Sequence, residues 1–333
     1  MYICKDCFLD EELRSEINAN AVINGVCDVC GKEGKLMDFS DFHGFFNALL
    51  SLFSLTDNSN KTIVDIIQDE WHIFKDKDVA KIISTSHLDY SIDTCVDYTN
   101  EIQDRVAVWD RLKNSVKENS RFFTNMDEFA QYEYLTAGKS LHIGQKLYRS
   151  RVTPIGQKKI KWDKMGCPPK ELTTAGRANP IGIPYLYLSD SAKTTYFEVR
   201  AVYLDKLSVG TFRIEKDLKL IDFVYDVNLF LSYNDGSVPL KETIIKKKVI
   251  EAISSDLSKP LRRYDSEIEY VPTQLICEYC RRIVDSEGAT ADGITFESSL
   301  HKGGRNYVLF DESAAKCIRV DSHEITRIDI DRK

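Results

Sequence analysis

The sequence is poor in the residues that mark repetitive or disordered chains. Its 333 residues include only 16 glycines and 8 prolines, while 43% of them are hydrophobic and 11% are aromatic. This composition supports packed cores and excludes a collagen-like, low-complexity or mostly disordered protein. The length is sufficient for one large domain or for two or three smaller ones.

Long apolar runs are lacking as well. The most apolar stretch near the N-terminus, residues 44–55, is too short and too polar to span a bilayer. The first residues, Met-Tyr-Ile-Cys-Lys-Asp-Cys, have neither the charged start nor the long apolar segment of a signal peptide. We therefore expect a soluble, cytoplasmic protein that has no membrane partner.

The chain also lacks an excess of basic residues. It has 45 Lys and Arg against 52 Asp and Glu, which gives a net charge of −7. This balance disfavours a general nucleic-acid binder, so no nucleic-acid partner is expected. The charge is unevenly distributed, because residues 139–177 contain ten basic residues and only two acidic ones, Asp163 and Glu171.

The basic stretch has no G-x-G-x-x-G motif and no P-loop, the usual glycine-rich cradles for nucleotides. Two interpretations remain open. Lys158, Lys159 and Lys161 are typical of a solvated loop. Arg149 and Arg177 would suit a phosphate-bearing ligand, because a guanidinium group can bind two oxygens at once.

Four of the nine cysteines have the spacing of metal ligands. Cys4 and Cys7 form one CxxC pair, and Cys27 and Cys30 form a second pair after 19 intervening residues. Two such pairs complete a tetrahedral Cys4 zinc site, and four thiolates leave no open coordination position. The sequence therefore predicts a structural zinc ion. Chance pairs or a redox motif are the alternatives, although no βαβ pattern accompanies these cysteines.

The remaining cysteines indicate no site. Cys277 and Cys280 fall in residues 272–284, where apolar residues recur at helical spacing, so they are interpreted as helix residues. Cys95, Cys167 and Cys317 stand alone in the sequence, and nothing marks them as nucleophiles. Thiols in a cytoplasmic protein are expected to stay reduced.

Hydrophobic periodicity divides the chain into three predicted parts, residues 1–36, 37–140 and 141–333. The first is the zinc knuckle, and the second has helical patterns only, at 38–55, 79–83, 98–116 and 127–135. In the third part we expect helices at 191–202, 241–257 and 272–284. Strands are expected there at 145–152, 183–189, 210–214, 218–222, 293–296, 306–310 and 325–330. The predicted fold class is α+β, with a zinc knuckle and an all-helical module followed by a mixed-sheet domain.

Four sequence blocks, in order, resemble the RES-domain family. Residues 176–200 read GRANPIGIPYLYLSDSAKTTYFEVR, and LYRSR at 147–151 is similar to the family's opening strand. Residues 293–310, GITFESSLHKGGRNYVLF, resemble its C-terminal block, and PTQ at 272–274 also fits. The resemblance covers residues 141 to about 325. The preceding region is similar to the HEPN/RES N-terminal region of longer family members.

The resemblance implies a fold like that of the ADP-ribosyltransferase toxins and an activity on NAD. Family members break the bond between nicotinamide and ribose by hydrolysis or phosphorolysis, and several are toxins paired with an antitoxin. By position, the implied catalytic residues are Glu198, Arg177, Tyr187 and Ser298. The implied NAD-binding residues are Arg149, Arg177, Tyr187 and Ser298, with Ser299 as the alternative for the serine role.

Physical chemistry gives these residues specific tasks. Nicotinamide leaves NAD as a neutral molecule, so the difficulty is the positive charge that develops on the ribose, and a fixed carboxylate such as Glu198 would stabilise it. Tyr187 offers a flat face for stacking. The alternatives are structural: Glu198 as a surface carboxylate paired with Arg200 or Lys193, Tyr187 as a core residue, and Ser298 as a turn residue.

Several functions are compatible with the sequence. The favoured one is an NAD-degrading enzyme with a toxin-like or defensive role; the others are a protein ADP-ribosyltransferase and a non-catalytic, zinc-scaffolded interaction module. A ribonuclease role for the helical module is disfavoured, because no histidine follows an arginine at the Arg-x4–6-His spacing. Expected partners are NAD, an antitoxin or regulatory protein, and a second copy of the chain in a homo-oligomer.

Overall fold

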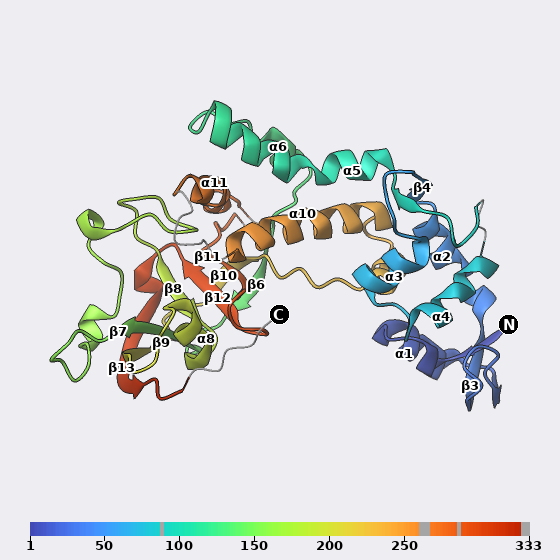
Figure 1. Cartoon of the computed structure of the whole chain (residues 1–333), viewed down its shortest axis with the longest axis horizontal. Coiled ribbons are helices and arrows are strands. Elements are labelled where there is room, and N and C mark those ends of the chain that lie inside the picture. The colour runs from blue at the N-terminus through green and yellow to red at the C-terminus, as the bar shows by residue number, and fades with distance from the viewer. Residues whose placement is uncertain (87–89, 260–266, 285–287, 328–333) are drawn as a thin grey trace. The chain divides into compact units, whose positions relative to one another are not determined.

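The computed structural model describes residues 1–86, 90–259, 267–284 and 288–327 (Figure 1). The chain forms two compact units. The first comprises residues 1–107 and 226–248, and the second comprises residues 108–225 and 249–333. These units have other bounds than the three consecutive segments expected from the sequence, because residues 108–140 belong to the second unit and residues 226–248 to the first. The division of the chain into domains at 1–36, 37–140 and 141–333 stays a prediction.

The first unit begins with a small antiparallel sheet. Its strands are β1 (Tyr2–Cys4), β3 (Glu33–Asp38) and β2 (Ile23–Val26), in that spatial order. Helix α1 (Glu11–Asn20) lies between β1 and β2 in the sequence and buries Leu13 and Ile17. Asp10 starts this helix, because its carboxylate accepts hydrogen bonds from the backbone N–H groups of Glu12 and Leu13.

Short helices make up most of the rest of the first unit. They are α2 (His43–Leu50), α3 (Ile63–Trp71), α4 (Lys77–Ala80), α5 (Asn100–Val106) and α9 (Leu229–Asp235). The prediction of an all-helical segment at 37–140 was wrong, because residues 53–55, 96–98 and 137–140 lie in strands. Strands β4 (Phe53–Leu55) and β5 (Val96–Tyr98) pair antiparallel within it, and the rings of Phe53 and Tyr98 pack with centroids 4.5 Å apart. A three-residue strand is too short to show an alternating pattern.

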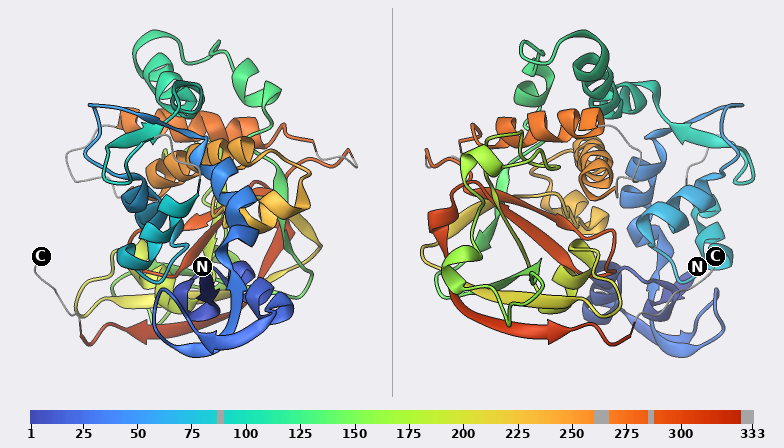
Figure 2. Two further views of the ribbon diagram at one scale, coloured as in Figure 1. Left: turned by 90° about the vertical axis from the view of Figure 1, so that its right-hand side faces the viewer. Right: turned by 60° about the vertical axis from the view of Figure 1, so that its left-hand side comes forward.

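The second unit contains a mixed eight-stranded sheet, which confirms the predicted α+β class (Figures 1 and 2). The spatial order is β13-β9-β7-β8-β12-β11-β10-β6, and β13 lies at one edge. All neighbours are antiparallel except β10 and β11. The strands are β6 (Ala137–Leu141), β7 (Lys146–Val152), β8 (Leu186–Ser189), β9 (Lys206–Ile214), β10 (Leu218–Asp222), β11 (Gly293–Glu297), β12 (Arg305–Leu309) and β13 (Ala315–Glu324).

A hydrophobic cluster stabilises this sheet, with Leu147, Leu188, Phe212 and Leu309 among its buried members. The unit also contains the helices α6 (Val108–Asn114), α7 (Asp127–Gln131), α8 (Ala192–Glu198) and α11 (Val271–Cys280). Helix α8 packs on β7 and β8, and α11 packs on β11. Helix α10 (Leu240–Ser258) begins in the first unit and ends in the second. Within the described part of the chain, no helix has the length and apolar character needed to cross a membrane.

Several predicted elements have other bounds in the structure: the helix expected at 38–55 ends at Leu50, and the helix expected at 272–284 ends at Cys280. The helix expected at 191–202 ends at Glu198, because Arg200 adopts a left-handed conformation that stops it. The strand expected at 325–330 is replaced by β13, which ends at Glu324, and residues 328–330 lie outside the described residues. The early end of α8 matters for function, since it places Glu198 in the last turn of the helix.

Candidate active site

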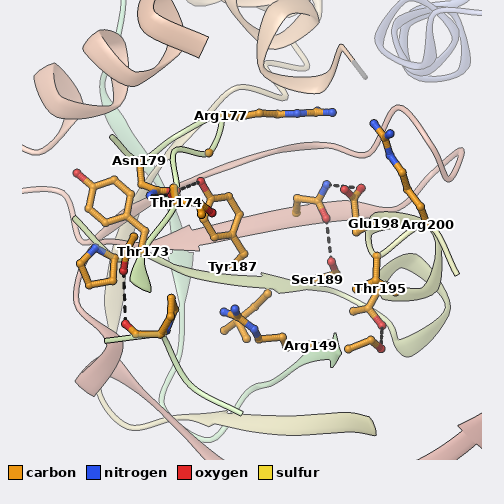
Figure 3. Close-up of a pocket in the computed structure, with 18 of the residues that line it drawn as sticks. Arg149, Thr173, Thr174, Arg177, Asn179, Tyr187, Ser189, Thr195, Glu198 and Arg200 are labelled. Atoms are coloured by element: carbon orange, nitrogen blue, oxygen red, sulfur yellow. Dashed lines mark hydrogen bonds between the residues drawn. The ribbon is translucent and has the colours of Figure 1, made fainter. Parts of the chain in front are cut away.

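A cavity of about 780 Å³ lies in the second unit and contains most of the residues implied by the resemblance (Figure 3). Arg149 on β7, Tyr187 on β8, Glu198 at the end of α8 and Arg177 in the connection before β8 line this cavity. Among the described lining residues, Arg149, Arg177 and Arg200 are basic and Glu198 is acidic. The cavity is therefore suited to an anionic ligand that places a positively charged or electron-poor atom near Glu198.

Two side chains fix one oxygen of the Glu198 carboxylate. Ser298 Oγ donates to Glu198 Oε1 over 2.6 Å, and Asn306 Nδ2 donates to the same oxygen over 2.8 Å. No donor from the described residues is assigned to Oε2. The predicted alternative, a surface carboxylate paired with Lys193 or Arg200, is thus not the arrangement found. One oxygen is held by the protein, and the other is available to a ligand.

The turn that carries Ser298 is built to approach α8 closely. Ser298 N–H donates to Gly304 O over 2.8 Å, and Ser298 Oγ also accepts from the N–H of His301 at 3.1 Å. A Cβ atom at Gly304 would lie 2.7 Å from Thr194 Oγ1 on α8. Glycine is therefore required at this position for steric reasons, which explains the second glycine of the GG in the 293–310 block.

Arg149 has an unsatisfied hydrogen-bonding group inside the protein. Its Nη1 is buried and has no hydrogen-bond partner among the described residues. Burial, and then the nearby Arg151, lower the pKa of Arg149 to about 10, so the side chain is still positively charged at neutral pH. A buried cationic donor without an acceptor is costly for folding, and a phosphate oxygen in the cavity would satisfy it.

Tyr187 presents its ring to the cavity while its hydroxyl group is engaged elsewhere. The hydroxyl donates to Asn179 Oδ1 over 2.8 Å and accepts from the N–H of Ala178 at 3.1 Å. Burial raises the pKa of Tyr187, so it stays a neutral phenol. A Cβ at Gly176 would lie 2.9 Å from this hydroxyl and 2.5 Å from Asn179 Oδ1, which explains the glycine before Arg177. The ring face is what remains for a ligand.

Arg177 and Ser299 both contact the C-terminal end of α10. Arg177 Nη1 donates to Leu257 O over 2.8 Å and to Ser258 O over 2.7 Å, and Ser299 Oγ donates to Ser258 O. These are carbonyls that a helix end leaves without an intrahelical partner. Arg177 lines the cavity and also caps a helix, whereas neither Ser298 nor Ser299 is among the described lining residues. The contact with Glu198 favours Ser298 over Ser299 for the serine role.

Sequence reasoning missed several residues that support the site. Ser189 Oγ donates to Asn306 Oδ1 over 2.8 Å and so orients the amide that binds Glu198. On α11, Thr273 Oγ1 donates to Arg177 O over 2.7 Å, and Gln274 Nε2 donates to Gly176 O over 2.8 Å. The PTQ and GGRN sequences contained the signal, because Thr273, Gln274 and Asn306 lie in the blocks that carry the family resemblance.

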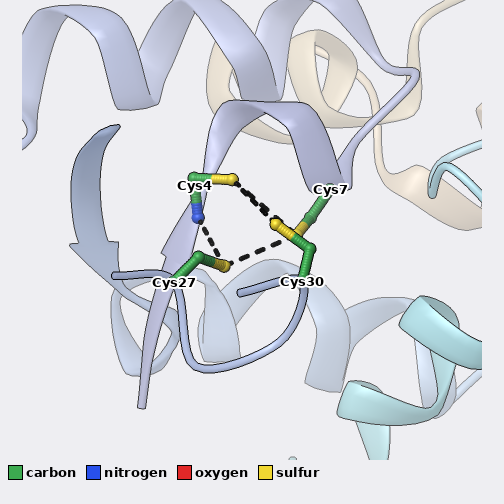
Figure 4. Close-up of side chains that lie close together, drawn as sticks. All are labelled: Cys4, Cys7, Cys27 and Cys30. Carbon is green, nitrogen blue, oxygen red and sulfur yellow. Dashed lines mark hydrogen bonds between the residues drawn. The ribbon is translucent and has the colours of Figure 1, made fainter. Parts of the chain in front are cut away.

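The four N-terminal cysteines converge in the first unit, as the spacing predicts (Figure 4). Their sulfur atoms all lie within 4.8 Å of one another, with separations of 3.9 Å for Cys4–Cys7, 3.4 Å for Cys4–Cys30 and 3.7 Å for Cys7–Cys27. Four sulfurs placed about 2.3 Å from a zinc ion would be separated by about 3.8 Å at tetrahedral angles. The cluster could therefore bind a metal ion of this size.

Backbone donors favour the thiolate form at one of the four cysteines, Cys27. The N–H of Cys4 donates to Cys27 Sγ over 3.4 Å. Burial raises the pKa of Cys4 to about 11 and also raises that of Cys7, whereas at Cys27 the backbone N–H groups of Cys30, Val29 and Cys4 outweigh burial and lower the pKa to about 7. The thiolate is the form of cysteine that binds metal ions.

A carboxylate held by Ser298 and Asn306 and an arginine whose Nη1 is buried line one cavity of the second unit, which is an arrangement suited to an anionic ligand. Comparison with known families identifies the domain: residues 147–330 match the RES domain, and this chain belongs to the RES-domain family. No curated protein and no solved structure matches the chain. Family membership supports an NAD-related enzymatic role of the ADP-ribosyltransferase type.

Proposed function

We propose that the protein is an NAD-degrading enzyme that cleaves the bond between nicotinamide and ribose. The observation that carries this proposal is the state of Glu198, whose Oε1 accepts from Ser298 and Asn306 while Oε2 has no described donor in the cavity. The cavity volume of about 780 Å³ is sufficient for a dinucleotide. The buried, unpartnered Nη1 of Arg149 supports a phosphate-bearing ligand.

Each residue has a task in this reaction. Glu198 would stabilise the oxocarbenium-like ribose as the C–N bond to nicotinamide breaks and the bonding electrons leave with the neutral base. Arg149 would bind the pyrophosphate, and the ring of Tyr187 would stack against one of the substrate rings. Arg177 would shape the cavity wall, with Ser298 and Asn306 holding the carboxylate in place.

The acceptor of the ribosyl group decides which enzyme this is. Water gives ADP-ribose, nicotinamide and a proton. Inorganic phosphate gives ADP-ribose 1″-phosphate and nicotinamide, and a protein side chain gives an ADP-ribosylated protein and nicotinamide. Glu198 Oε2 could accept a hydrogen bond from an O–H or N–H group of any of these acceptors, so the products must be measured.

The test is to incubate the purified chain with NAD, with and without phosphate, and to identify the products by chromatography and mass spectrometry. We expect nicotinamide to be released and Glu198→Gln to slow its release at least a hundredfold, since it removes the charge while keeping an acceptor for Ser298 and Asn306. Glu297→Gln, an exposed carboxylate next to Ser298 in sequence, is the control. Intact NAD with the wild-type chain would exclude the enzyme, and labelled protein would indicate a transferase.

We further propose that the Cys4, Cys7, Cys27 and Cys30 cluster binds a structural zinc ion. The sulfur separations and four-cysteine composition fit that ion, and a closed site suits a structural role.

A cytoplasmic enzyme that consumes NAD would harm its own cell unless its activity were controlled. We therefore also propose a toxin-like or defensive role in which an antitoxin or another regulatory protein controls the enzyme. Assembly as a homo-oligomer is a separate part of the proposal.

A further inference from the structure

Arg200 adopts a backbone conformation that is unfavourable for an arginine. Its φ angle is +50°, and it directly follows the C-cap of α8, Val199. The N–H of Arg200 donates to Phe197 O over 2.9 Å, and the N–H of Ala201 donates to Tyr196 O over 3.1 Å. This pair of bonds is the Schellman motif, in which the left-handed position is usually glycine. The chain thus has a bulky side chain at a position where glycine would have a lower conformational energy.

The side chain of Arg200 lies at the candidate active site. It lines the same cavity as Glu198, two residues earlier, and Figure 3 shows its guanidinium group near the top of the cavity, on the side of Glu198. Arg149 appears in the lower part of the same view. Non-glycine residues in left-handed conformations cluster at functional sites, where the position of the side chain offsets the strain.

A second strained residue nearby provides a comparison. Leu204 has a φ angle of +70°, but its side chain is 60% exposed and does not line the cavity. The two positions share a left-handed backbone and lie four residues apart in one connection. They differ in whether the side chain reaches the cavity, which allows strain and binding to be separated by experiment.

We infer that Arg200 is a substrate-binding residue that contacts a phosphate group of the dinucleotide at the mouth of the cavity. This inference rests on the proposed function. Arg149, whose Nη1 is buried, and Arg177 line the same cavity, so Arg200 adds a third guanidinium group to it. Arg200 is exposed, carries a guanidinium group suited to phosphate oxygens, and is close in sequence to the carboxylate that acts on the ribose.

The test compares Arg200→Gly with Leu204→Gly in the full chain. Glycine relieves the left-handed strain at both positions, so each variant should melt a few degrees above wild type. Arg200→Gly should raise the KM for NAD about tenfold or more with a much smaller effect on kcat, because it removes a charge-assisted contact. Leu204→Gly should leave KM unchanged. The KM of wild type should rise more steeply with salt than that of Arg200→Gly.

The outcomes separate this inference from the proposed function on which it rests. Equal KM values and equal salt dependence for wild type and Arg200→Gly, with wild type active, would overturn the role of Arg200 alone. A wild-type chain that neither cleaves NAD nor binds it in calorimetry would overturn both. Arg200→Lys, which keeps the charge and the strain, should retain the salt dependence and part of the affinity.

Discussion

Asn306 donates its side-chain N–H to Glu198 Oε1 over 2.8 Å, and the direction of this bond is fixed by a third residue. Ser189 Oγ donates to Asn306 Oδ1 over 2.8 Å, so the amide oxygen faces Ser189 and the amide nitrogen faces the carboxylate. Ser189 and Asn306 also face each other in the pairing of β8 with β12. The carboxylate of Glu198 is therefore positioned by the sheet itself, through Asn306.

This relationship predicts an unusual pH dependence for Asn306→Asp. The new carboxyl group would lie next to Glu198, and two carboxylates at hydrogen-bond distance are stable only when they share a proton. Near pH 5 the shared proton should replace the lost amide donor and preserve activity. As the pH rises toward 8 the proton is lost, the two charges repel, and kcat should fall.

Rate measurements from pH 5 to 8 on wild type, Asn306→Asp and Asn306→Ala check this prediction. Asn306→Ala should lose about ten- to a hundredfold in kcat/KM at every pH, since it removes a hydrogen bond to a charged group. The same pH profile for Asn306→Asp and Asn306→Ala would show that Asn306 does not act through the carboxylate.

The neighbouring serines Ser298 and Ser299 should respond differently to substitution. Ser298 Oγ binds Glu198 Oε1 over 2.6 Å, whereas Ser299 Oγ binds the Ser258 carbonyl at the end of α10. We expect Ser298→Ala to lower kcat/KM by about ten- to a hundredfold and Ser299→Ala to cost less activity. A larger loss for Ser299→Ala would assign the serine role to that residue instead.

The outline of the fold could be predicted because it depends on local patterns. Apolar periodicity gave α10 at 241–257, where the structure has Leu240–Ser258, and β7 and β8 within two or three residues at each end. The end of α8 could not be predicted in this way. It depends on the left-handed backbone of Arg200, and glycine, not arginine, is the residue type that indicates such a helix end in a sequence.

The site could be predicted only in part, because hydrogen bonds between distant residues are not visible in a single sequence. The motifs named Arg149, Tyr187 and Glu198, and all three line the cavity. They also named Arg177, whose bonds to Leu257 and Ser258 connect it to a helix 80 residues later in the sequence. Knowing that contact requires the fold, since nothing near Arg177 in sequence indicates it.

Loss of the metal ion from the cysteine cluster should affect stability more than catalysis. Elemental analysis should find one zinc ion per chain, and Cys4→Ser should abolish binding, because three thiolates remain where four are needed. Since a structural zinc contributes directly to folding, Cys4→Ser should reduce solubility and thermal stability more than NAD turnover per folded molecule. Cys95→Ser, a cysteine of the first unit outside the cluster, should keep the full zinc content.

Arg149→Met should make the protein more stable and less able to bind NAD. The substitution removes a buried cation whose Nη1 has no described partner, and such groups cost about 1–3 kcal/mol. Because burial lowers the pKa of Arg149 to about 10, below its usual value, the folded state binds this proton more weakly than the unfolded state. The cost is therefore complete below pH 10 and decreases as the pH rises through that value.

Denaturant unfolding of wild type and Arg149→Met at pH 8 and pH 11 measures the difference in their free energies of unfolding. The variant should be more stable at pH 8, and the difference between the two proteins should shrink at pH 11. In parallel, calorimetry with NAD should show binding to wild type and loss of affinity in the variant by at least tenfold. A variant that is less stable at pH 8 and still binds NAD normally would show that Arg149 is a structural residue, and the phosphate site would have to be sought elsewhere in the cavity.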